Sequence, residues 1–468
     1  MSKAGWLAAI VGAAAVIAVG ALLGSDSTRA IGLAVPIGLL LVVAMVWEPT
    51  YFLLFYVALR PLADAAVHVQ IGPMSLGALW GGGLMIALAL YWVARGLRQA
   101  VRDISWLLPI AFALAYAVFT FGRGGDTAYA FSSWIKIASW VLLAITCEQI
   151  AATAAGQRAI VRAGTLMAVL TVAVIALAVV QNQYGAAYYT YGQYDTVGQG
   201  PHQLASMAVL LTTFVWIGAM HGVGRMRWLY VALAGLLGVG IALSLVRTTF
   251  LAFALLTVWF LIWSLRGKRW GPVVAALAAT TAAGAVVYTF QSSVVQRMTD
   301  LSNLSLGGSA ALSAGSGRLG IWQAVWTSAT STSAALLLGQ GASASFAVTA
   351  AVLGNDLWSH NDFLEFLITG GVVLLGLYIL TIGWMLVSGT RLFRDAARLR
   401  PVRDLGQLVA AAVVAYVVMA FFNGMAFFES TLVMAMLVGL VRGVQRTPGC
   451  SFIDEQTSVA ELPGPEAR

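Results

Sequence analysis

The chain has 468 residues, of which 60% are hydrophobic and 9% charged, and its mean hydropathy is +0.88. Soluble domains carry roughly 25% charged residues, so this composition excludes a soluble globular protein and indicates a polytopic membrane protein. The net charge of +8 comes without a basic stripe or a recognisable reader motif, which excludes nucleic acid as a partner. The two cysteines, Cys147 and Cys450, fall near a span and in the C-terminal tail, so no disulfide framework is predicted.

Apolar stretches long enough to cross a bilayer recur along the chain and predict an all-α protein with roughly 12–14 transmembrane helices. They lie at about 6–23, 30–47, 51–67, 76–94, 105–121, 130–147, 159–181, 203–220, 228–246, 249–265, 271–289, 361–387, 405–422 and 428–443. The third stretch is the weakest, because Arg60, Pro61 and Asp64 interrupt it. The first is read as a retained helix, since no clear cleavage site follows it.

The stretches divide the chain into five parts. N-terminal helices occupy 1–180, central helices 181–289 and C-terminal helices 361–446. A periplasmic catalytic loop is expected at 290–360, and a flexible cytoplasmic tail at 447–468.

Basic residues predict the orientation of the bundle. With Met1 in the cytoplasm, 19 of the 26 Lys and Arg fall in cytoplasmic segments, as the positive-inside rule requires. We therefore expect both termini in the cytoplasm. The seven other cations lie on the outer side or within spans, where they need compensation: Arg29, Arg60, Arg123, Lys136, Arg247, Arg297 and Arg318.

Two outer loops are long. The loop at 181–202 is rich in Tyr, Gly and Gln. The loop at 290–360 contains RLGIWQAVWTSATS, which places Leu319, Trp322 and Trp326 at helical spacing. We expect this second loop to form an ordered cap with one or two amphipathic helices near the outer membrane surface.

Three of the seven cations are candidates for anion binding. Arg247 stands at a tight outer turn, where it either meets an anion in bidentate fashion or snorkels to the headgroups. Arg318 follows a Gly/Ser stretch and is either an arm over a ligand or a solvated loop residue. Lys136 is predicted to be buried in a span, paired with Asp126, Asp64 or a ligand.

The most unusual polar cluster opens the span at 361–387. An imidazole at His360 can take up a proton near neutral pH, and Asp362 and Glu365 either set its tautomer or hold a ligand hydroxyl. A lone histidine is more often structural than catalytic. His202 opens another helix, as a cap or a ligand contact. No spacing of metal ligands or Asp-x-Asp pair is present in the sequence, so we expect neither a metal nor a cofactor.

Four motifs occur in a fixed order: SLVRTTF around Arg247, SGRLGIW around Arg318, LLLGQGASASF, and SHNDFLEFLITGG around His360. In this order they resemble the bacterial O-antigen ligases and O-antigen or exopolysaccharide polymerases, relatives of the protein O-oligosaccharyltransferases. The likeness runs from about 198 to 376. One departure is His202, which stands where the family often has Asn.

The resemblance implies a metal-independent, inverting glycosyltransferase of the GT-C class at the periplasmic face of the bacterial inner membrane, in lipopolysaccharide or exopolysaccharide biosynthesis. Its donor would be an undecaprenyl-diphosphate-linked glycan, and its acceptor a glycan, a lipid A core or a protein. It implies His360, Arg318 and Arg247 as catalytic residues. Substrate-binding candidates are His202, Asn361, Glu365, Lys136 and Tyr194.

An alternative function is a lipid-linked oligosaccharide flippase or another polytopic transporter. A transporter of that kind is expected to show repeat symmetry and polar residues through both leaflets. The sequence shows no such repeat, and its polar candidates cluster at one face.

Overall fold

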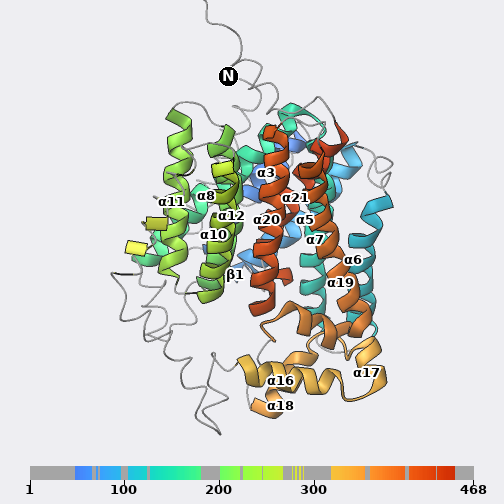
Figure 1. Ribbon diagram of the computed structural model, residues 1–468. Helices are drawn as coiled ribbons and strands as arrows, with labels where there is room; N and C mark the ends of the chain where they lie inside the picture. Colours follow the sequence, from blue (N-terminus) through green and yellow to red (C-terminus); the bar gives the residue numbers. More distant parts are fainter. Residues whose placement is uncertain are drawn as a thin grey trace, which may run out of the picture.

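The computed structural model describes the following residues: 48–65, 70–71, 74–95, 104–123, 127–180, 201–221, 225–244, 246–266, 318–353, 359–395, 400–427 and 430–447, with a few single residues between 273 and 288. Within these ranges the fold is a helical bundle (Figure 1). Its extended pieces are β1 (Gln70–Ile71) and β2 (Met74–Ser75), a two-residue antiparallel pair. The predicted all-α membrane fold is confirmed.

Eight helical segments of the described chain are long and apolar enough to cross a membrane. They are α6 (Leu107–Phe121, with the 3-10 turn before it), α7 (Thr127–Ile150), α8 (Ala154–Val180), α10 (Pro201–His221), α11 (Arg225–Leu243), α12 (Arg247–Arg266), α19 (Asp362–Arg394) and α20 (Arg400–Phe422). Helices α5 (Leu76–Arg95) and α21 (Ser430–Arg446) join the bundle. The stretches predicted at 6–23 and 30–47 lie outside the described residues, as does nearly all of 271–289, so the total of 12–14 stays a prediction.

The interrupted third stretch is a broken helix, as its sequence indicates. It forms α3 (Pro49–Ala58) and α4 (Arg60–Ala65), with Leu59 between them. The buried guanidinium of Arg60 lies over the ring of Trp80 on α5, 4.6 Å from its centroid. A cation held against an aromatic face tolerates a low-dielectric position.

Three short helices lie across one end of the bundle: α16 (Arg318–Ala329), α17 (Ser333–Leu338) and α18 (Ala344–Leu353) (Figure 1). They form an ordered cap within the second loop, with three helices where one or two were predicted; residues 290–317 of that loop lie outside the described residues. The helix predicted from the spacing around Trp322 is confirmed as α16, in which Leu319 and Trp326 are exposed while Ile321 and Val325 are buried against the first turns of α19. The exposed apolar side chains fit a position at the membrane surface.

The cap is fastened to a break in α19. Backbone at Gly370 and Gly371 leaves the helical conformation, with φ +64° at Gly371. The N–H groups of Gln340 and Gly341, in the turn after α17, donate to the carbonyls of Ile368 (2.6 Å) and Thr369 (3.0 Å). The loop thereby satisfies carbonyls at the helix break, and the contact fixes the cap relative to the start of α19.

At the opposite end, α7 and α21 enclose a buried ionic cluster. The carboxylate of Glu148 accepts hydrogen bonds from the indole N–H of Trp106 and from Arg442 (3.1 Å), and it forms a salt bridge with Arg446. Gly439 allows the two helices to approach, since a Cβ there would meet the backbone of α7. This end of the bundle is held together by paired charges.

Candidate active site

His360 lies in a tight turn immediately before α19. Its φ of +50° is in the left-handed region, which non-glycine residues seldom adopt and which histidine, asparagine and aspartate enter most readily. Asn361 follows as the N-cap, and its side-chain oxygen accepts from the N–H groups of Phe363 (2.9 Å) and Leu364 (3.1 Å). A strained residue at a helix start is a recurrent feature of functional sites.

The backbone before His360 is held by the cap. The indole N–H of Trp322 on α16 donates to the carbonyl of Ser359 at 2.9 Å. The Trp322 ring also packs against Phe421 and Phe422 at the end of α20, with centroids 5.5 and 6.0 Å away. Three elements distant in sequence therefore fix the position of the imidazole.

The environment of His360 keeps its imidazole neutral. Burial, and then the nearby charge of Arg318, lower the pKa of His360 from 6.5 to about 4. Arg318 is the first residue of α16 and is partly buried. At neutral pH the imidazole is thus in the form that accepts a proton.

Asn423 connects Arg318 to the start of α12. Its side-chain oxygen accepts a long hydrogen bond from Arg318 (3.4 Å), and its amide nitrogen donates to the hydroxyl of Thr248 (3.0 Å). Thr248 follows Arg247, the partly buried first residue of α12. The structure therefore brings the neighbourhoods of the three predicted catalytic residues to one end of the bundle.

Asn423 is a residue that sequence reasoning missed. It is buried and lies just after α20, where it is followed by Gly424. An Asn-Gly pair after an apolar run signals only a helix end. Its role as a link is visible only when α12, α16 and α20 meet.

The turn before Arg247 has the predicted tight geometry. Helix α11 ends at Leu243, and the hydroxyl of Ser244 donates to the carbonyl of Ile241 (2.6 Å) and accepts from the N–H of Val246 (3.2 Å). These bonds close the reversal in three residues. Arg247 consequently begins α12 at the same end as the cap.

The acidic residues after His360 have structural contacts. Asp362 is fully buried and its Oδ2 accepts from the Tyr378 hydroxyl (2.7 Å) and the Ala426 N–H (2.9 Å). Its effect on the tautomer of His360 stays a prediction. Glu365 is buried and accepts from the hydroxyl of Ser345 on α18 (3.1 Å). Asn361 caps α19. Substrate contacts by Glu365 and Asn361 remain predictions.

The other binding candidates are more scattered. Lys136 is exposed on α7, so its predicted burial inside the bundle is wrong. His202 is the second residue of α10 and is partly buried. Tyr194 lies outside the described residues. Among the residues that the structure describes, no three His, Cys, Asp or Glu side chains gather as metal ligands would.

The fold and this polar cluster define a class: a multi-pass membrane protein with a neutral imidazole and two arginines at one end of its helical bundle. Residues 232–379 match the family model described as O-antigen ligase. The match covers about a third of the chain and supports the resemblance to the O-antigen ligase superfamily drawn from the motifs. The matched residues include Arg247, Arg318 and His360. No curated protein matches the chain significantly.

Proposed function

We propose that the protein is a GT-C-class glycosyltransferase that works at the periplasmic face of the bacterial inner membrane. It transfers a glycan from an undecaprenyl-diphosphate carrier to an acceptor hydroxyl, with inversion and without a metal. The family match supports a ligase-type role in the membrane. The donor, the mechanism and the orientation are proposed in addition to that match.

The observation that carries the proposal is the linkage of Arg318 to both His360 and the start of α12. The charge of Arg318 acts on His360, and Asn423 ties Arg318 to Thr248 beside Arg247. A neutral imidazole near the guanidinium of Arg318 suits a reaction in which a base accepts a proton and an anion leaves.

In the proposed reaction the acceptor oxygen attacks the anomeric carbon of the donor glycan. The hydroxyl proton passes to the imidazole of His360 as the new C–O bond forms. The bond between the anomeric carbon and the diphosphate oxygen breaks, and undecaprenyl diphosphate leaves. Arg318 and Arg247 stabilise the negative charge that develops on the leaving diphosphate.

The proposed orientation follows from the distribution of cations over the two ends. Arginines gather at the end opposite the cap, where α11 begins and where α12, α19 and α21 end: Arg225, Arg227, Arg266, Arg391, Arg394, Arg442 and Arg446. The positive-inside rule assigns that end to the cytoplasm. The His360 end then faces the periplasm.

Reconstitution of the purified full-length protein with a defined lipid-diphosphate donor tests the proposal. Two acceptors, a lipid A core and a second lipid-linked repeat unit, separate ligase from polymerase by which of them grows. We expect one acceptor to gain glycan, equally in the presence of a chelator. Loss of transfer on chelation with recovery on adding Mg²⁺ would contradict the metal-free mechanism.

The same vesicles distinguish the alternative function. A flippase moves the intact donor between leaflets and forms no new glycosidic bond. Movement of donor without a glycosylated product, for either acceptor and for a protein acceptor, would replace the glycosyltransferase proposal with the transporter.

A further inference from the structure

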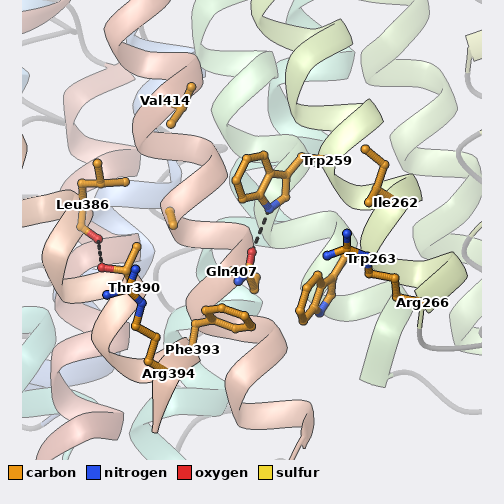
Figure 2. Close-up of a pocket in the computed structure, with 11 residues that line it drawn as sticks. Trp259, Ile262, Trp263, Arg266, Leu386, Thr390, Phe393, Arg394, Gln407 and Val414 are labelled. Carbon is orange, nitrogen blue, oxygen red and sulfur yellow. Dashed lines mark hydrogen bonds between the residues drawn. The ribbon is translucent and has the colours of Figure 1, made fainter.

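A cavity of about 440 Å³ lies between α12, α19 and α20, at the end of the bundle opposite His360. Figure 2 shows Trp259, Trp263 and Arg266 on one side of it, facing Phe393 and Arg394 on the other. Its volume falls in the range of roughly 300–1,000 Å³ typical of small-ligand sites. We call this cavity the α12–α20 groove.

Two tryptophans held by hydrogen bonds form one apolar wall of the groove. The indole N–H of Trp259 donates to the side-chain oxygen of Gln407 (2.9 Å), and that of Trp263 donates to Asp404 (2.6 Å). Both bonds run to α20 (Figure 2 shows the first). Because the indole nitrogens are satisfied there, the rings present carbon to the space between the helices.

The groove opens sideways, toward the membrane. Trp259 is 43% exposed, and Val414 on the facing helix is 38% exposed. Both residues line the cavity and lie within helices of spanning length. An apolar opening on this side of a membrane helix bundle faces lipid chains.

The mouth of the groove is cationic. Arg266 ends α12, with its guanidinium 5.9 Å from the ring centroid of Trp263, and Arg394 ends α19. Both arginines line the cavity and are exposed. In the described part of the chain neither guanidinium forms an ion pair. The groove therefore has apolar walls between the helices and two positive charges where α12 and α19 end.

We propose that the α12–α20 groove is a binding site for one anionic glycerophospholipid of the leaflet at this end of the bundle. An acyl chain lies against Trp259, Leu386 and Val414, and the headgroup phosphate meets Arg266 and Arg394. Charge complementarity selects an anionic lipid over a zwitterionic one, since each arginine near a membrane surface favours anionic lipid. The site is distinct from the His360 cluster and does not depend on the proposed glycosyl transfer.

Native mass spectrometry of the delipidated full-length protein tests this site. The protein is mixed with equal amounts of phosphatidylglycerol and phosphatidylcholine of matched chains, and the lipid that stays bound on activation is counted. For two arginines we expect a preference for phosphatidylglycerol of about thirtyfold. The double variant Arg266→Gln/Arg394→Gln should lose that preference.

Two further variants separate the groove from general surface charge. The matched control Arg162→Gln/Arg225→Gln removes two exposed arginines from the same end, on α8 and α11, and should keep the preference. Val414→Trp fills the groove and should reduce retention of both lipids. Thermal unfolding in detergent checks that each variant is folded.

The result that overturns the proposal is an equal preference for phosphatidylglycerol in the wild type and in the Arg266/Arg394 variant. Loss of the preference in the Arg162/Arg225 control would also overturn it, because the selectivity would then be a property of the whole surface. Retention of both lipids unchanged in Val414→Trp would exclude the groove as the chain-binding surface.

Discussion

The two ends of the helical bundle use arginine differently. At one end Arg442 and Arg446 meet the buried carboxylate of Glu148. At the other end Arg318 donates to the neutral amide of Asn423. The first contact pairs opposite charges, whereas the second orients a guanidinium whose charge acts on His360.

This difference separates a structural ion cluster from a candidate reaction site. The Glu148 cluster joins α7 to α21 and stabilises the fold. The Arg318 contact joins α16 to the end of α20 next to a strained, neutral histidine. Substitutions at the first end should act on stability, and those at the second on turnover.

Replacing His360 should have the largest effect. His360→Asn keeps a residue that tolerates the left-handed backbone but removes the proton acceptor, so glycan transfer should fall by about 10²–10⁴-fold. The measurement is initial rate in proteoliposomes, with thermal unfolding to confirm the fold. The matched control is His221→Asn. His221 is the last residue of α10 and lies at the end of the bundle opposite His360, so its replacement should leave the rate unchanged.

Replacing Glu148 should affect stability. Glu148→Gln leaves Arg442 and Arg446 near a neutral amide in a buried site, and breaking such a cluster costs about 3–5 kcal/mol. The apparent unfolding temperature in detergent should drop, while the folded fraction keeps its turnover. Glu48→Gln, at the partly exposed start of α3, is the control. A loss of turnover with unchanged stability would erase the distinction between the two ends.

Replacing Arg318 tests the functional end again. Arg318→Lys keeps one positive charge but loses the planar fork that contacts both Asn423 and a diphosphate, so turnover should fall by about 10²–10³-fold. Arg123→Lys, on an exposed residue after α6 at the same end, should have little effect. Full activity of Arg318→Lys would show that Arg318 acts only as a point charge.

Much of the fold could be predicted because membrane helices are encoded locally by runs of apolar residues. The break between α3 and α4 was also predictable, since Arg60, Pro61 and Asp64 stand there in the sequence. The residues of α16 that are buried, Ile321 and Val325, could not be predicted, because their burial depends on where α19 lies.

The site could be predicted in part. Arg247 and His360 stood out because they are polar residues at the ends of apolar spans, and Arg318 because it is a cation in the second predicted outer loop. Asn423 gave no such signal, because its hydrogen-bond partners, Arg318 and Thr248, are 105 and 175 residues away in the chain. Lys136 misled for the opposite reason: position within a span says nothing about which side of the helix a residue occupies.

Substitutions at Gly371 and Gly376, both on α19, test whether the helix break fixes the cap. A Cβ at Gly371 would lie 2.3 Å from the backbone of Leu337, and its φ is +64°, so Gly371→Ala should cost about 1–3 kcal/mol. No atom lies within 4 Å of a Cβ at Gly376, so Gly376→Ala should be tolerated. Thermal unfolding compares the two, and equal stability would show that the cap does not depend on the α19 break.

The smallest expected effect is a displaced pH dependence. Because the pKa of His360 is lowered to about 4, the neutral imidazole persists as pH falls from 7 to 5, and kcat/KM should stay nearly constant there before falling near pH 4. A histidine with its ordinary pKa of about 6.5 would already lose most of its base form at pH 5.5. Bound diphosphate offsets the charge of Arg318, so the fall in kcat should come at higher pH than the fall in kcat/KM. Coincident profiles for kcat and kcat/KM would show that the arginine and the histidine do not meet the donor together.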